Sequence, residues 1–84
     1  MLIRSADKTK IVNLANVNLI EIVDSHREEY RYGIWIDECK AAEYKTFQRT
    51  IEVLNEICNA YIGLNSFKGN APYVKNGIYQ MPEE

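Results

Sequence analysis

The sequence has very few of the residues that build catalytic and metal centres. It holds one histidine, His26, and two cysteines, Cys39 and Cys58, which are far apart in the chain. The cysteines lack the short spacing that marks a structural zinc site. Asp24 and Ser25 stand next to His26, but neighbours on one turn do not supply the geometry of a catalytic triad. We therefore expect no metal, no cofactor and no enzymatic activity, with His26 in a solvated loop.

Long apolar runs, an excess of basic residues and a glycine-rich phosphate loop are also missing. An apolar run such as 34–36 is far shorter than the roughly 20 residues of a membrane span. Twelve acidic residues outnumber ten basic ones, and the net charge of −2 disfavours a general nucleic-acid binder. The first residues do not form a signal peptide. We expect a cytoplasmic protein without a membrane partner and with reduced cysteines, a disulfide being the alternative.

What the sequence does contain is typical of one small domain. Hydrophobic residues make up 46% and charged residues 26% of its 84 residues, which leaves room for a single domain with a thin core. We predict one domain over 1–84, with a β-meander over 1–37, because short β-prone segments alternate there with polar turns. A loop and a short terminal strand are predicted over 63–82, where Asn76-Gly77 signals a turn.

The strongest pattern predicts one long helix over 46–62. Thr46 is a suitable N-cap and Gly63 a suitable C-terminal stop. Between them, an apolar stripe at helical spacing is formed by Phe47, Ile51, Leu54, Cys58 and Tyr61, and Ile57 and Ile62 widen it. Such a stripe is typical of a helix that lies on a sheet. We therefore predict an α+β fold, in which one long helix packs on one face of an antiparallel sheet of about four or five strands.

Two segments and the single helix carry a resemblance. The chain opens with Ile-Arg-Ser-Ala-Asp-Lys over 3–8 and ends with Asn-Gly-Ile-Tyr-Gln-Met-Pro-Glu-Glu over 76–84. These pieces resemble a group of small proteins of low-GC Gram-positive bacteria and their phages and prophages. The resemblance implies no activity and no site residues, but it implies a phage setting, in which small proteins often blunt host defence. Residues 39–43 depart from the group's pattern, and no strand is predicted there.

The basic residues gather towards the two ends of the chain. Residues 1–20 and 57–82 each carry a net charge of +2. If the terminal strand lies beside the first hairpin, these cations surround tyrosine rings and an amide. A nucleotide-like ligand needs this chemistry, since phosphates bind Lys or Arg and bases stack on tyrosine. The residues predicted to bind it are Arg4, Lys8, Lys10, Lys68, Tyr73, Lys75, Asn76 and Tyr79. The alternative is that these are ordinary surface lysines and polar turns.

Alternation in the strand predicted over 30–36 separates two faces. Tyr32, Ile34 and Ile36 point one way, whereas Trp35 points the other. One helix covers only one face of a sheet, so the face with Trp35 needs another explanation. An aromatic residue there favours contact with a second subunit, and we predict a homo-oligomer interface at Trp35. The alternative is a half-exposed tryptophan without a partner.

These features favour a non-enzymatic binding protein. We expect it to sequester a small, anionic, nucleotide-like signalling molecule, in pockets between subunits of a homo-oligomer, as an anti-defence protein in the host cytoplasm. The alternative is a protein–protein inhibitor of a host defence protein or nuclease. In that hypothesis Glu52 and Glu56 on the exposed helix face, with Glu43 nearby, mimic phosphate groups.

Overall fold

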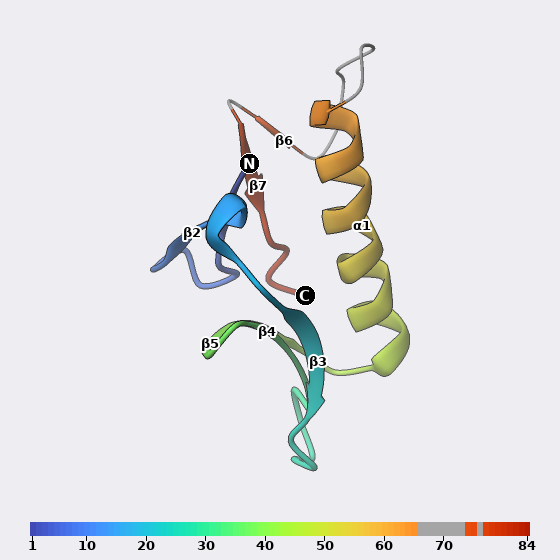
Figure 1. Ribbon diagram of the computed structural model, residues 1–84. Helices are drawn as coiled ribbons and strands as arrows, with labels where there is room; N and C mark the ends of the chain where they lie inside the picture. Colours follow the sequence, from blue (N-terminus) through green and yellow to red (C-terminus); the bar gives the residue numbers. More distant parts are fainter. Residues whose placement is uncertain (66–73, 76) are drawn as a thin grey trace.

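The computed structural model describes residues 1–65, 74–75 and 77–84, and these form one long helix and two sheets (Figure 1). The helix is α1 (Phe47–Asn65), and a short 3-10 turn, η1, covers Leu14–Asn16. The strands are β1 (Leu2–Arg4), β2 (Ile11–Asn13), β3 (Ile20–Asp24), β4 (Tyr32–Ile36), β5 (Cys39–Tyr44), β6 (Val74–Lys75) and β7 (Ile78–Gln80). The predicted α+β class is confirmed.

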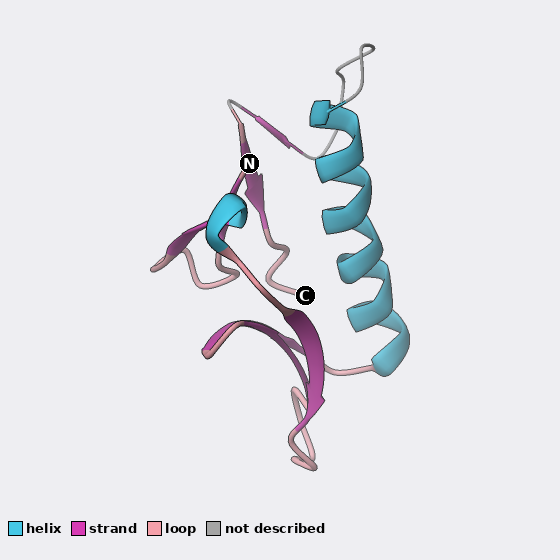
Figure 2. Cartoon of the chain, in the orientation of Figure 1, coloured by secondary structure: helices cyan, strands magenta, loops and turns pink. Residues whose placement is uncertain are grey.

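The strands divide between two sheets instead of forming one. The first sheet has the order β2-β1-β7-β6, and the second has the order β3-β4-β5. Figure 2 shows the first sheet near the C-terminal end of α1 and the second near its N-terminal end. The prediction of a single antiparallel sheet was wrong on two counts, since β1 and β7 also pair in parallel. Strand β1 pairs with β2 on one edge and with β7 on the other, so β3 cannot pair with it. The meander predicted over 1–37 is therefore interrupted at η1.

Strand β5 was not predicted, and two local features account for it. Asp37 adopts a φ of 53°, which allows a tight turn between β4 and β5. Its carboxylate accepts hydrogen bonds from the N–H groups of Asn18 (3.1 Å) and Leu19 (3.0 Å). The ladder then shifts register between Ile34 and Trp35, which makes room for one extra residue on β5. Because the strand contains alanines and a bulge, its sequence lacks the alternation of hydrophobic and polar residues by which a strand is predicted.

Helix α1 begins where predicted but ends later. The Thr46 hydroxyl accepts a hydrogen bond from the Arg49 N–H at 3.1 Å, so the predicted N-cap is confirmed. The helix continues through Gly63 to Asn65, so the predicted stop at Gly63 was wrong. Gly63 therefore lies inside α1 and does not end it in the left-handed conformation that was predicted. Within the described residues, no helix is long and apolar enough to cross a membrane.

The buried face of α1 is rotated from the predicted stripe. Its fully buried residues are Thr50, Val53, Ile57 and Ala60. Phe47 and Tyr61 of the predicted stripe are 53% and 48% exposed, and Cys58 is also exposed. The small side chains lie innermost because they let the helix approach the sheets closely, and the larger apolar residues flank them. Ile57, which was predicted to widen the stripe, is buried, whereas Phe47, Cys58 and Tyr61 lie at the rim of the helix–sheet contact.

One core joins the helix to both sheets. Ile3 and Tyr79 come from the first sheet, Ile34 and Tyr44 from the second, and Val53 from α1, and each is at most 1% exposed. A hydrogen bond from the Ala6 N–H to the Ala41 oxygen, at 2.9 Å, ties the first hairpin to β5. The two sheets thus share a single hydrophobic interior.

The β3–β4 loop is held by an ion pair. Arg31 donates two hydrogen bonds to the Asp24 carboxylate, at 2.8 and 2.9 Å, and the His26 N–H donates a third at 2.8 Å. Hydrogen bonding and charge from Arg31 lower the pKa of Asp24 to about 2. The His26 side chain is 77% exposed, which confirms the predicted solvated loop position.

We expect the Asp24→Asn variant to be less stable than the wild type at neutral pH and equally stable in strong acid. A carboxyl group whose pKa is lowered by folding stabilises the fold above its unfolded pKa of about 3.9, and this contribution disappears as the pH falls towards 2. Urea midpoints measured between pH 7 and pH 2 test this. The control is Glu28→Gln, which removes an exposed carboxylate of the same loop. Equal pH slopes for wild type and Asp24→Asn would contradict the assignment.

Candidate functional site

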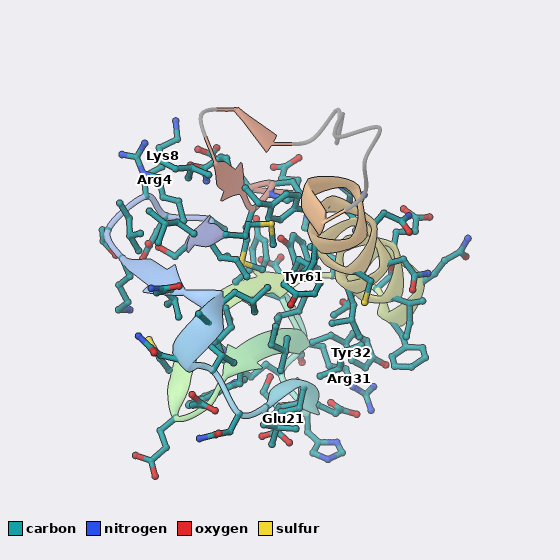
Figure 3. All side chains as sticks on the ribbon, turned by 45° about the horizontal axis from the view of Figure 1, so that its top comes forward. Arg4, Lys8, Glu21, Arg31, Tyr32 and Tyr61 are labelled. Atoms are coloured by element: carbon teal, nitrogen blue, oxygen red, sulfur yellow. The ribbon has the colours of Figure 1, made fainter. Side chains whose placement is uncertain are left out.

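The premise of the predicted site is correct, because β7 lies beside the first hairpin. It pairs with β1 so that Arg4 stands opposite Gln80 and Ile3 opposite Tyr79. Ile3 is buried, which places Arg4 on the outer side of the sheet. Figure 3 shows the side chains of Arg4 and Lys8 on the same side of the molecule, pointing away from α1. Lys8 makes a 4.0 Å ion pair with Glu83.

Tyr79 is not a ligand-stacking residue. Its ring is 1% exposed and belongs to the core, and its hydroxyl donates to Glu56 at 3.2 Å. Burial, together with the negative charge of Glu56, raises the pKa of Tyr79 well above its usual value. The alternation of β7 explains the error, since Ile78 and Gln80 occupy the outer face on either side of it.

The other predicted ligand residues do not define a site. Lys68, Tyr73 and Asn76 lie outside the described residues. Lys75 belongs to β6, in register with Ile78. Lys10 is exposed just before β2. Within the described residues, the predicted cations and rings are therefore not gathered around one cavity.

The last residues of the chain cross over the start of α1. The Tyr44 hydroxyl donates to the main-chain oxygen of Pro82 at 2.8 Å. Arg49 donates from Nε and Nη2 to the main-chain oxygen of Glu84, at 3.1 and 3.0 Å. Its third nitrogen, Nη1, lies 3.2 Å from Glu52 and 3.5 Å from Glu56. Arg49 therefore fixes the C-terminal segment to the first turns of the helix.

A hollow lined by two basic side chains and one acidic side chain opens beside this segment. We call it the tail pocket; it measures about 220 Å³ and is lined by Tyr30, Tyr44, Lys45, Thr46, Arg49 and Glu84. The Lys45 ammonium lies 5.5 Å from the centre of the Tyr30 ring, in a cation–π contact. Among the described residues, no salt bridge uses Lys45. The tail pocket thus offers an ammonium group without a salt bridge among the described residues, next to Arg49, an aromatic ring and the acidic Glu84.

A second hollow also includes Tyr30 in its lining. We call it the hairpin pocket; it measures about 310 Å³ and is lined by Ala6, Asp7, Tyr30, Lys40, Ala41, Ala42, Glu43 and Glu83. Three alanines give it an apolar floor, and three carboxylates stand at its wall. Asp7 is held by the Ser5 and Thr9 hydroxyls at 2.7 and 2.6 Å. Hydrogen bonds from Thr9 and then Ser5 keep the pKa of Asp7 well below its usual range.

Tyr30 is the residue that both pockets share. It adopts a φ of 50°, a left-handed conformation that is uncommon for a bulky side chain. This conformation ends the β3–β4 loop and explains why the strand begins at Tyr32 instead of Tyr30. The Tyr30 side chain therefore contributes to the lining of both hollows.

Sequence reasoning missed Tyr30, Lys45 and Arg49 as site residues. Lys45 precedes the N-cap Thr46, whereas Arg49 lies in the first turn of α1, so helical spacing does not predict that they share a pocket. The acidic neighbours Glu52 and Glu56 also gave this part of the helix the pattern of an acidic face. Tyr30 was interpreted as a sheet residue, and its left-handed conformation leaves no trace in a hydrophobic pattern.

The acidic helix face does not form a free patch. Glu52 and Glu56 are both engaged with Arg49, and Glu56 also accepts the Tyr79 hydroxyl. Glu43 lies on β5 and pairs with Arg27 and Lys40, both at 3.4 Å. Phosphate mimicry by these three carboxylates is therefore less well supported than a pocket-bound ligand.

Both cysteines are free thiols, and the described residues contain no group of three His, Cys, Asp or Glu side chains able to share a metal ion. Comparison of the chain with family models, curated proteins and solved structures gives no significant match.

Proposed function

We propose that the protein is a non-enzymatic binder of a small nucleotide-like anion, held by the tail pocket and the hairpin pocket together. The observation that carries this proposal is that a hollow lined by Lys45 and Arg49 and an apolar, acid-rimmed hollow both include Tyr30 in their linings. A nucleotide has the matching polarity, with an anionic phosphate at one end and a flat base carrying N–H donors at the other.

The phosphate end fits the tail pocket. Lys45 supplies a mobile ammonium that is free of ion pairs among the described residues, and phosphate can replace its weak contact with Tyr30. Arg49 is already bonded to the main chain at Glu84 through two of its nitrogens. A phosphate therefore gains most of its charge interaction from Lys45, while Arg49 keeps the wall of the pocket in place.

The base end fits the hairpin pocket. Ala6, Ala41 and Ala42 offer an apolar surface without side chains that reach into the hollow. Glu43 and Glu83 provide acceptors for exocyclic amino groups, since an ionised carboxylate accepts and does not donate. The Tyr30 ring supplies an aromatic surface, and base–aromatic stacking is worth roughly 1–3 kcal/mol.

Replacement of Lys45 with alanine is expected to weaken the binding of AMP about tenfold, because a hydrogen bond to a charged group contributes roughly 1.5–3 kcal/mol. Adenosine, which lacks the phosphate, is expected to bind wild type and Lys45→Ala equally. Amide chemical shifts followed during titration with AMP, adenosine and inorganic phosphate measure both the affinity and the location.

Lys10→Ala is the matched control, because it removes the same charge from the first hairpin, outside both pockets. Weaker AMP binding in Lys10→Ala, with no change in Lys45→Ala, would place the site where the sequence predicted it. No shift with any of the three probes at millimolar concentration would overturn the proposal.

The broader role that we propose is sequestration of a signalling nucleotide in a phage setting. Its support is the resemblance of the segments over 3–8 and 76–84 to small proteins of phages and prophages, together with the two pockets described above. A binder of this kind protects a bound nucleotide from its receptor without changing it. Recovery of an unaltered nucleotide from the denatured protein, purified from infected cells, tests this role.

A further inference from the structure

The face of the second sheet that points away from α1 is partly open to solvent. Ile34 and Ile36 of β4 point into the core, so Trp35 points to the opposite side, as predicted. Trp35 and Val23 are partly exposed, and Glu21 and Lys40 are exposed. We call the surface formed by Glu21, Val23, Trp35, Lys40 and Glu43 the open face.

The indole ring of Trp35 packs closely against the sheet on the open face. A Cβ atom added to Gly33 would approach the indole Nε1 to 3.2 Å, so the indole lies against the backbone of Gly33. The glycine leaves room for the ring to lie close to the sheet, next to Val23 on the neighbouring strand. The result is a rigid aromatic platform, which is the type of residue that dominates the energy of protein interfaces.

The charges beside Trp35 have opposite signs on its two sides. The register places Glu21 of β3 opposite Trp35 on one side and Lys40 of β5 opposite it on the other. Each neighbouring strand lies about 4.8 Å from β4. Among the described residues, Glu21 has no ion-pair partner in its own chain, and Figure 3 shows it at the periphery of the molecule. Lys40 has only a 3.4 Å contact with Glu43.

These charges are complementary between two copies of the chain for one orientation of a two-fold axis, but not for another. If two open faces stack about an axis that runs along β4, the flanking strands exchange sides, and Glu21 faces the partner subunit's Lys40 twice. If the axis runs across the strands, Glu21 faces the partner subunit's Glu21 and Lys40 faces the partner subunit's Lys40. Like charges placed opposite each other are strongly unfavourable. The charges therefore select the first arrangement, which is also the aligned packing usual for stacked sheets.

We propose that a second copy of this chain covers the open face in an isologous dimer, with Trp35 at the two-fold axis and two Glu21–Lys40 pairs around it. A chain of 84 residues has a thin core, and burial of an aromatic platform in a dimer adds apolar contact that the single domain lacks. The proposal is argued from the sheet register and from charge, although two residues of the open face, Lys40 and Glu43, also line the hairpin pocket.

Charge reversal tests the proposal with two variants and their mixture. Glu21→Lys makes the open face basic and Lys40→Glu makes it acidic, so we expect each variant alone to dimerise on the order of a hundredfold more weakly than the wild type. An equal mixture of the two variants restores both ion pairs, and we expect it to form heterodimers. The double variant Glu21→Lys/Lys40→Glu is expected to dimerise like the wild type. Sedimentation across a concentration series measures the mass, and circular dichroism confirms that each variant is folded.

Three outcomes would overturn the proposal. The first is a wild type that remains monomeric up to millimolar concentration. The second is a dimer that survives both single reversals, which would indicate another interface such as the exposed edge of β3. The third is a mixture of folded Glu21→Lys and Lys40→Glu that stays monomeric while the wild type dimerises.

Discussion

Replacement of Tyr79 with alanine is expected to unfold a large part of the population at physiological temperature. The ring is 1% exposed and packs in the core that joins both sheets to α1. Truncation of a buried aromatic residue costs about 3–5 kcal/mol, against a total stability of roughly 5–15 kcal/mol for a small domain. Because a loss of about 1 kcal/mol lowers the melting temperature of a domain this size by roughly 4–8 °C, a decrease of more than 12 °C is expected.

Two further variants separate the contributions of Tyr79. Tyr79→Phe removes only the hydrogen bond to Glu56 and is expected to cost about 1 kcal/mol, since Glu56 keeps its contact with Arg49. Ile11→Ala truncates an apolar residue of the same sheet that is 58% exposed, and it is expected to change stability by less than about 0.5 kcal/mol. Thermal unfolding followed by circular dichroism measures all three.

The same variant also decides between two roles for this tyrosine. The sequence predicted Tyr79 as a residue that stacks on a ligand, whereas the structure makes it part of the core. A Tyr79→Ala protein with unchanged melting temperature and lost AMP binding would support the ligand role. A destabilised protein, with Tyr79→Phe binding AMP normally, would support the structural role.

The parts of the fold that were predicted depend on local signals. The helix was found because its apolar spacing and the Thr46 cap act within a few residues, and the outward direction of Trp35 followed from strand alternation. The parallel pairing of β7 with β1 was not predictable in this way, because it joins residues from the two ends of the chain and depends on the free edge of β1. Strand β5 was missed since its bulge and alanines give no alternation.

The site was missed for a related reason. Tyr30, Lys45 and Arg49 converge because a left-handed tyrosine ends one loop where the helix begins beyond β5. Local patterns of hydrophobic and polar residues do not predict that these segments lie close together in the fold. The predicted site depended on the condition that the terminal strand lies beside the first hairpin, and the structure meets this condition. Tyr79 nevertheless turns inward, and the Lys8 ammonium forms an ion pair with Glu83.

A buried polar layer is formed by the C-terminal segment, Tyr44 and Tyr79. We expect alkaline pH to destabilise it. Tyr44 and Tyr79 are each 1% exposed, and their hydroxyls donate to Pro82 and Glu56. Burial raises the pKa of both phenols, and the negative charge of Glu56 raises it further. Each hydroxyl donates a hydrogen bond to its partner, and a phenolate cannot donate one, so ionisation is incompatible with the native contacts.

We therefore expect cooperative alkaline unfolding above about pH 10, the ordinary pKa of tyrosine. A group whose pKa is raised by folding contributes full stability below its unfolded pKa and loses it as the pH rises. The loss is about 1.4 kcal/mol per pH unit for each phenol, so two phenols remove roughly 5 kcal/mol between pH 10 and pH 12. That loss is comparable to the whole stability of many small domains.

The measurement is a pH titration that follows phenolate absorbance and circular dichroism together. The two buried phenols are expected to ionise in the same step in which secondary structure is lost, because the native fold keeps them protonated. Tyr79→Phe and Tyr44→Phe should each reduce the pH slope of stability by one proton, and the double variant by two. Ionisation of all tyrosines before unfolding would show that the phenols reach water, and the C-terminal segment would then not seal this layer. If ionisation of the phenols coincides with unfolding, the C-terminal segment that lines the tail pocket also protects the core. The pocket and the fold are then lost together.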